Sequence, residues 1–185
     1  IKKAPHEASY RIERSFLYGD LQAWDQALLD VDEAIRLTPR DPALFFHRAQ
    51  FRLQQNKLGE AVDDFLQAIR FDPNFGQAHF RLGWLYYCLD ADKETAAIEH
   101  LTRAIVLTRD HPVIRLHRAV AYMAQNKFAL AMEDCHHVLI VEPDNAHAHG
   151  VLGRVLQCEE QFEEAIVACT RAIELGNEDA PVYLA

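Results

Sequence analysis

One short pattern returns along this chain at a nearly constant interval. Equivalent loop positions are occupied by Pro5, Pro39, Pro73, Arg109, Pro143 and Asn177. Every interval between them is 34 residues except the third, which is 36. The same pair of residues precedes four of them, at Ala34-Ile35, Ala68-Ile69, Ala104-Ile105 and Ala172-Ile173. A fixed period of this length predicts a linear array of repeats, in which the core forms between neighbours instead of at one centre.

The net charge and the lack of long apolar segments argue against some classes of binding partner. The chain of 185 residues has a formal net charge of -9 and an isoelectric point near 5.5. This argues against nucleic acid and anionic membranes, because affinity for phosphate comes largely from clustered Lys and Arg. No apolar run approaches the roughly 18 residues of a membrane span, and no secretory signal pattern is visible. The sequence therefore predicts neither a nucleic-acid nor a membrane partner.

The cysteines indicate the compartment. Cys88, Cys135, Cys158 and Cys169 show no Cys-x-x-Cys spacing and fall at apolar helix positions. A disulfide framework would place them in loops at regular spacings. We therefore expect free thiols, with Cys135 and Cys169 in the core, and a reducing, cytoplasmic location.

Residues 42–75 illustrate one repeat. Asp41 followed by Pro42 is typical of a helix N-cap with proline at the first helical position. Apolar residues then recur at a spacing of three to four, which predicts an amphipathic helix. After the polar break at 55–57 a second such helix follows, and Asp72-Pro73 ends it, since proline disfavours a helical residue before it. Each repeat is thus expected to be a helical hairpin.

Small residues recur at two positions of every repeat. The eighth holds Ser15, Ala49, Gly83, Ala119 and Gly153. The twentieth holds Ala27, Ala61, Ala97, Ala131 and Ala165. Small side chains on facing helices let the two backbones approach closely. We expect both positions to be buried at the contact between the two helices of each hairpin.

This arrangement resembles the tetratricopeptide repeat, which has a small residue at position 8, Ala at position 20 and Pro at position 32. The resemblance implies an all-α fold, a right-handed α-solenoid of antiparallel helix pairs whose first helices line a concave groove. Five repeats are expected at 8–41, 42–75, 76–111, 112–145 and 146–179, and a further helix is expected to start at 180–185. The third repeat contains two extra residues, which we place between Leu89 and Glu94 as a loop insertion.

The repeats depart from the family pattern in a way that relates some of them. Position 7, a Leu in the family, is Leu82 and Leu152 in two repeats. In the other three it is an arginine, at Arg14, Arg48 and Arg118. Repeats two and four also share His-Arg-Ala and Gln-Asn-Lys. Duplication of a two-repeat unit would explain this likeness.

The sequence offers little for catalysis or metal binding. There is no Gly-x-Ser-x-Gly, no glycine-rich phosphate loop and no His-Glu-x-x-His. The acidic pairs Asp63-Asp64, Glu159-Glu160 and Glu163-Glu164 are expected on solvent-facing surfaces and not as acid/base pairs. Neither Cys135-His136-His137 nor His147-x-His149 suits chelation from one helix, because such neighbours point in different directions. We expect no enzyme activity, no cofactor and no metal.

Some members of this family hold the acidic C-terminus of heat-shock chaperones with a carboxylate clamp. The resemblance places that clamp at Lys and Asn of one repeat, Asn of the next, and Lys and Arg of a third. Starting from the first repeat, the chain has Ile12, Phe16, His47, Gln77 and Arg81 at those positions. Only the last matches, and the other two registers match no better. The sequence therefore argues against a chaperone-tail function.

Apolar residues occupy the expected groove instead. Position 9, where the family favours a polar Asn, holds Phe16, Trp84 and Val120. We predict that a partner segment binds there, with Phe46, Phe80, Trp84, Tyr87, Leu116 and Val120 as apolar contacts and Arg81 and His117 as polar ones. The alternative is that these side chains pack against neighbouring helices or an internal segment.

Three functional hypotheses follow. The first is a noncatalytic scaffold that binds a peptide or helical segment of another protein in the groove. The second makes the array a regulatory or substrate-recruiting part of a larger enzyme. The third is self-association through the exposed ends of the solenoid. In each case the partner is a protein.

Overall fold

The computed structural model describes residues 4–89 and 93–176 of the protein, with side chains from residue 7 onward. All regular structure in these ranges is helical, which confirms the predicted all-α fold. Part of the expected insertion in the third repeat, and the further helix expected at 180–185, lie outside the described residues. The helices are α1 (Ala4–Asp20), α2 (Trp24–Leu37), α3 (Pro42–Gln54), α4 (Leu58–Phe71), α5 (Gly76–Leu89), α6 (Glu94–Leu107), α7 (Pro112–Ala124), α8 (Phe128–Val141), α9 (Ala146–Cys158) and α10 (Phe162–Glu174).

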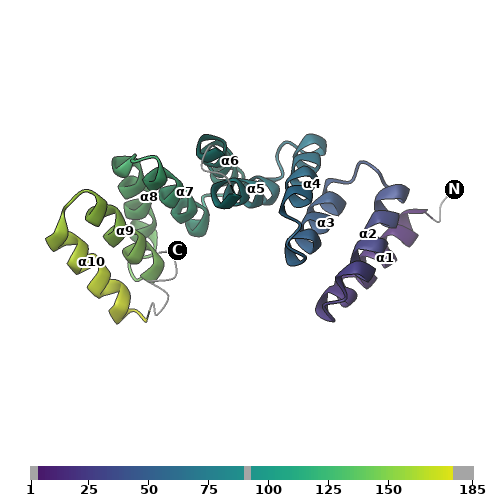
Figure 1. Ribbon diagram of the computed structural model, residues 1–185, viewed down its shortest axis with the longest axis horizontal. Coiled ribbons are helices and arrows are strands. Elements are labelled where there is room, and N and C mark those ends of the chain that lie inside the picture. Colours follow the sequence, from purple (N-terminus) through teal and green to yellow (C-terminus); the bar gives the residue numbers. More distant parts are fainter. Residues whose placement is uncertain (1–3, 90–92, 177–185) are drawn as a thin grey trace. The chain divides into compact units, whose positions relative to one another are not determined.

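Consecutive helices form tandem antiparallel hairpins, such as α3 with α4 and α9 with α10 (Figure 1). The chain divides into two compact units, residues 1–85 and 86–185. The division falls within α5, so the first unit holds α1 to α4 and most of α5. The second holds the end of α5 and α6 to α10.

Local sequence sets where the helices begin and turn. Asp41 caps α3, since its Oδ1 accepts a hydrogen bond from the Ala43 amide at 3.0 Å and Pro42 follows it, as expected. Asn145 caps α9 in the same way through the Ala148 amide at 2.9 Å. Within four of the hairpins, position 15 is left-handed with φ between 55° and 60°, at Gln22, Asn56, Asn126 and Glu160. Asn tolerates this conformation well, which explains the Gln-Asn-Lys turns of repeats two and four.

The small residues of positions 8 and 20 are all buried. Ala61 and Ala131 are fully enclosed, and a Cβ added at Gly153 would overlap Cys169 Sγ on the facing helix. The predicted close contact between the two helices of a hairpin is therefore confirmed. Larger side chains fill the space around it, as close packing requires.

Each unit has its own core. In the first, Phe46 packs on Phe65 and Phe75, with ring centroids 5.6 and 5.0 Å apart. In the second, one cluster joins α7, α8, α9 and α10 and includes Leu116, Cys135 and Val155. Burial of such side chains is the main favourable term in the stability of the helix pairs.

Charged pairs lock three of the hairpins. Arg14 donates to both oxygens of Asp30 at 2.6 Å, Arg48 to both oxygens of Asp64 at 2.9 and 2.7 Å, and Arg118 to both oxygens of Asp134 at 2.8 and 2.7 Å. In each pair the arginine is at position 7 and the buried aspartate at position 23. A second arginine reaches each aspartate, from Arg11, Arg52 and Arg115 respectively. Such bidentate, charge-assisted pairs fix the geometry of the two helices.

This finding corrects one expectation. Asp64 does not face solvent: it is 1% exposed and accepts hydrogen bonds from two arginines. Its neighbour Asp63 and the acidic residues at 159–160 and 163–164 are exposed, as predicted. The reason is helical geometry, because adjacent residues point about 100° apart and only one of the two can face the partner helix.

Repeats two and four also share contacts with the preceding repeat of the same unit. Arg48 Nη1 donates to Asp32 Oδ1 at 2.7 Å, and Arg118 Nη1 donates to Thr102 Oγ1 at 3.0 Å. Gln55 donates to Asp25 at 2.8 Å, and Gln125 to Thr95 at 3.1 Å. The residues that these repeats share in sequence thus make equivalent contacts.

Candidate peptide-binding surface

The predicted partner-binding residues lie on the first helices of the hairpins. Some belong to the first unit and some to the second, and each set is described by itself. In the first unit the predicted contacts lie on α3 and α5. Phe46 is only 6% exposed, because its ring packs between Phe65 and Phe75, so it offers little area to a partner. Phe80 and Trp84 are partly buried, and the exposed Arg81 lies over the Phe80 ring at 5.8 Å.

Phe16, which is not one of the predicted contacts, is more exposed than Phe46, Phe80 or Trp84. Phe16 on α1 is 42% exposed and stands edge-on to His47, with ring centroids 4.8 Å apart. His47 in turn contacts the Phe46 ring at 5.9 Å. Burial lowers the pKa of His47, although its hydrogen bond to Gln50 opposes that effect. Phe16 occupies position 9 of its repeat, as Trp84 does. That shared position is the sequence signal that could have placed Phe16 among the predicted contacts.

In the second unit the predicted contacts come from the end of α5 and from α7. Leu116 is 7% exposed and belongs to the core cluster of this unit, so it too offers little area. Val120 is partly buried against the same cluster. His117 is partly buried, with Nδ1 2.7 Å from the Val113 carbonyl oxygen. Val113, one turn earlier on α7, is 44% exposed.

Tyr87, at the end of α5, is partly buried. Burial raises the pKa of its hydroxyl, and the positive charge of Arg154 on α9 opposes part of that rise. Arg154 is partly buried and occupies position 9 of the fifth repeat. The predicted contacts do not include Arg154, although they include Trp84 and Val120 at the same position of other repeats.

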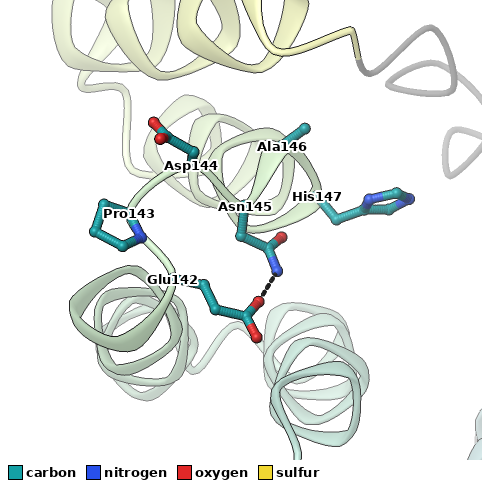
Figure 2. Close-up of a pocket in the computed structure, with 6 residues that line it drawn as sticks. All are labelled: Glu142, Pro143, Asp144, Asn145, Ala146 and His147. Carbon is teal, nitrogen blue, oxygen red and sulfur yellow. Dashed lines mark hydrogen bonds between the residues drawn. The ribbon is translucent and has the colours of Figure 1, made fainter.

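A shallow pocket of about 490 Å³ lies at the turn between α8 and α9 (Figure 2). Its lining residues are Glu142, Pro143, Asp144, Asn145, Ala146 and His147. Asn145 donates to Glu142 at 2.6 Å, as Figure 2 shows, and Arg171 donates to Asp144 at 2.6 Å. These polar groups are engaged in stabilising the turn, so we do not assign the pocket a ligand.

The described side chains hold no group of three or more His, Cys, Asp or Glu placed to bind a metal ion. All four cysteines are free thiols, and Cys135 is buried as expected. Cys169 is exposed, which corrects the expectation that it lies in the core like Cys135. The reason is its place on α10, for which the described chain provides no following hairpin. As far as the chain is described, none of its helices has the length and apolarity needed to cross a membrane.

Comparison with known proteins agrees with this architecture. A family model described as TPR repeat matches residues 51–90. Tetratricopeptide repeat protein 13 of Homo sapiens is 24% identical over 159 residues, which cover 83% of this chain and 18% of that protein. The E3 ubiquitin-protein ligase CHIP of Arabidopsis thaliana is 28% identical over 90 residues, which cover 49% of this chain and 32% of that protein. The chain thus spans less than a third of the length of these curated relatives.

Solved structures show the same fold. The crystal structure of YrrB, described as a TPR protein with an unusual peptide-binding site, superposes with a TM-score of 0.80. The match covers 94% of this chain and 89% of YrrB at 19% sequence identity. At that identity the likeness concerns the arrangement of helices and not the residues that contact a ligand.

Proposed function

Because this chain is a tetratricopeptide repeat protein, we propose that it is a noncatalytic protein-interaction scaffold that holds an extended or helical segment of a partner against its first helices. The observation that supports this most is the presence of accessible apolar groups at position 9, where the family favours Asn. Phe16 is 42% exposed, and Trp84 and Val120 are partly exposed. All three lie on first helices of their hairpins, the helices that the resemblance to the family implies line the groove.

We assign partner contacts to the predicted residues that are at least partly exposed. In the first unit, Phe80 and Trp84 supply apolar area and Arg81 fixes the orientation of the partner backbone. In the second, Tyr87 and Val120 supply apolar area and His117 fixes the orientation. Phe46 and Leu116 are buried and are therefore left out of the contact surface. A large aromatic ring gives much contact area at a low cost in conformational entropy. Truncation of such a residue at the centre of an interface commonly costs about 2 kcal/mol or more of binding energy.

The test is quantitative affinity capture combined with stability measurements. Wild type, Trp84→Ala, Val120→Asn and a control, Leu29→Ala, are immobilised and the captured proteins are quantified. Leu29 is 70% exposed on α2, a second helix of a hairpin, so its truncation removes apolar surface away from position 9. We expect the same proteins to be lost from both position-9 variants and retained by the control.

Thermal unfolding distinguishes binding residues from core residues. If Trp84→Ala and Val120→Asn unfold the protein while the folded fraction captures partners normally, these side chains belong to the core. The binding surface would then have to be sought on the second helices.

A second candidate function is recruitment of a substrate or regulator to an enzyme. It is favoured by the relative named as an E3 ubiquitin-protein ligase, of which this chain spans only 32%. Sequencing the gene beyond both ends of the present chain tests it: an adjoining catalytic domain would support this role, and its absence would leave the scaffold alone.

Self-association is a third candidate, and α10 supplies the observation. Phe162, Ile166, Val167 and Ile173 on this helix are each more than half exposed. Sedimentation velocity across a hundredfold range of concentration tests it, because self-association through this face would increase the mass with concentration and Ile166→Glu would abolish the increase.

A further inference from the structure

The junction between the first two hairpins shows how consecutive repeats pack. Leu44 and Phe51, at positions 3 and 10 of α3, are 4% and 7% exposed. Leu44 lies in a buried cluster with Ala34 of α2, and Phe51 lies in another with Val31 of α2. Side chains of α2 at positions 17, 21 and 28 pack against the second cluster, namely Trp24, Leu28 and Ile35. The first helix of a repeat thus covers one apolar face of the preceding second helix through positions 3 and 10.

The first helix of repeat one has these two positions uncovered. Position 3 is buried in repeats two to five, at Leu44, Ala78, Ile114 and Ala148. Position 10 is buried in the same repeats, at Phe51, Leu85, Ala121 and Val155. In repeat one these positions hold Tyr10 and Leu17, which are 69% and 62% exposed. The reason is that no hairpin precedes α1 within the described residues.

The second helix of repeat five has the other half of this junction uncovered. Counted without the two inserted residues of the third repeat, positions 17, 21, 24 and 28 are buried or half-buried in repeats one to four. In repeat five all four are exposed, at Phe162, Ile166, Cys169 and Ile173. Position 22 is exposed in every repeat and is Val167 in the fifth. The four uncovered residues of α10 are therefore those that meet a first helix elsewhere in the chain.

Two internal junctions add a polar contact to the apolar ones. In both, the arginine at position 7 of a first helix donates to the side chain at position 25 of the preceding second helix. Arg48 Nη1 donates to Asp32 Oδ1 at 2.7 Å. Arg118 Nη1 donates to Thr102 Oγ1 at 3.0 Å. Either a carboxylate or a hydroxyl thus serves as the acceptor at position 25.

The uncovered helices carry the same two polar groups. Arg14, at position 7 of α1, bonds Asp30 through Nε and Nη2, and its side chain is 57% exposed. Its Nη1 corresponds to the nitrogen that donates across the junction in repeats two and four. Thr170, at position 25 of α10, is exposed and corresponds to Thr102. The glutamine that makes a second contact at position 14 is Leu21 in repeat one, so that contact is not reproduced.

We propose that α1 of one copy of this chain docks on α10 of another, in the arrangement that consecutive repeats have within the chain. Tyr10 and Leu17 pack on the four uncovered apolar residues of α10, and Arg14 donates to the Thr170 hydroxyl. A second copy is the fitting partner because one molecule carries both halves of a junction that it already forms internally. The two surfaces differ, so the contact is heterologous. It rests on the self-association named above as the third candidate, because it specifies the second surface and the register.

The test uses sedimentation velocity under reducing conditions, with Leu17→Glu on α1 and Ile166→Glu on α10. Each variant places a carboxylate in one half of the contact and leaves the other half intact. The mass of wild type is expected to rise above the 21.2 kDa monomer as the concentration increases about a hundredfold, and each variant alone should stay monomeric. Val167→Glu is the matched control and should associate like wild type, because position 22 is exposed in every repeat.

Mixing the two variants distinguishes a heterologous contact from a symmetric one. Leu17→Glu retains the α10 surface and Ile166→Glu retains the α1 surface, so an equimolar mixture should form a 1:1 complex that grows no further. Thr170→Val has nearly the same shape and removes the acceptor of Arg14. It should weaken self-association by about tenfold, the usual effect of losing a hydrogen bond to a charged group. Thermal unfolding should be unchanged, because all the substituted side chains are exposed.

The outcomes separate the two proposals. If Leu17→Glu associates like wild type and Ile166→Glu does not, copies meet through α10 alone; the contact with α1 is then overturned and self-association stands. A mixture of the two variants that stays monomeric would also overturn the contact. Undiminished association of Thr170→Val would overturn the proposed register. If wild type is monomeric over the whole range, both this contact and self-association fail, and a different segment or protein covers α10.

Discussion

Arg48 and Asp64 face each other across the second hairpin and share two nearly parallel hydrogen bonds of 2.9 and 2.7 Å. The same relationship recurs in repeats one and four. In the repeats that have Leu82 or Leu152 at position 7, position 23 holds His100 or Ala168 instead of Asp. The two positions thus change together within one chain: three hairpins have an Arg–Asp pair, and the other two have Leu at position 7 and no carboxylate at position 23.

Removing Asp64 alone from the Arg48–Asp64 pair should destabilise the protein more than removing both side chains. Asp64→Ala leaves the Arg48 and Arg52 guanidiniums without their buried partner and should destabilise the protein by about 3 to 5 kcal/mol. The double variant Arg48→Leu with Asp64→Ala has the combination found in the fifth repeat and should be more stable than Asp64→Ala alone. Urea unfolding of Asp64→Ala, of Arg48→Leu and of the double variant measures the coupling. Strictly additive losses would show that the two residues do not act as a pair.

The stability of the first unit should depend on pH through Asp30. Hydrogen bonds from Arg14 hold the pKa of this carboxyl below its usual value, although burial opposes them. Because the folded pKa lies below the unfolded one, the carboxylate stabilises fully at neutral pH. That contribution is lost as the pH falls below about 5 toward the folded pKa.

Asp30→Asn should therefore lower the melting temperature at pH 7, and the difference from wild type should shrink as the pH is lowered. Circular dichroism melts between pH 7 and pH 3.5 measure this. A difference that stays constant over the whole range would mean that Asp30 does not titrate against its arginines.

Replacing Gly153 or Gly59 by alanine should change the stability of the protein in opposite directions. A Cβ at Gly153 would overlap Cys169 Sγ and lie 3.3 Å from the Ala165 carbonyl oxygen, so Gly153→Ala should destabilise by about 1 to 3 kcal/mol. A Cβ at Gly59, in the first turn of α4, meets nothing within 4 Å. Gly59→Ala should stabilise by about 0.5 to 1 kcal/mol, since Ala loses less backbone entropy in a helix. Melting curves of both variants test the pair, and a loss at Gly59 would contradict the open site.

Thiol reactivity should separate the four cysteines. Burial raises the pKa of Cys135 to about 12, and the charge of Asp134 adds to the effect. Cys88, Cys158 and Cys169 are exposed, although burial of the Cys88 thiol raises its pKa too. Because the thiolate is the reactive form, a colourless disulfide reagent at pH 8 should titrate three thiols in the native protein and the fourth only after unfolding in urea. Cys135→Ala should abolish the fourth reaction. Rapid labelling of all four sites in wild type would contradict the buried position of Cys135.

The sequence predicts the helical hairpins well because their signals are local. Asp41 with Pro42 starts a helix, Asp72 with Pro73 ends one, and the small residues at positions 8 and 20 mark the close contact. All of these depend on neighbours within a turn or on the repeat itself, so a period of 34 residues reveals them.

The candidate surface is harder to predict because exposure depends on the neighbouring helices. Phe46 and Phe16 lie on the same kind of helix, yet one is enclosed by Phe65 and Phe75 and the other is accessible. The aspartate partners of Arg14, Arg48 and Arg118 were also missed. Each lies 16 residues away on the other helix of its hairpin, and only comparison of position 23 across the repeats could have revealed them.

Three hairpins are joined by an Arg–Asp pair and two are not, so hairpins of one chain can fail under different conditions. Acid that protonates Asp30 removes its ion pair with Arg14 and so loosens the hairpin of repeat one. The fifth hairpin has Ala168 at position 23 instead, and the Sγ atom of Cys169 lies against Gly153 where an added Cβ would find no space. Oxidation of that sulfur would enlarge it where no space remains. One array of similar repeats therefore combines a hairpin that depends on pH with one that depends on the oxidation state of a cysteine.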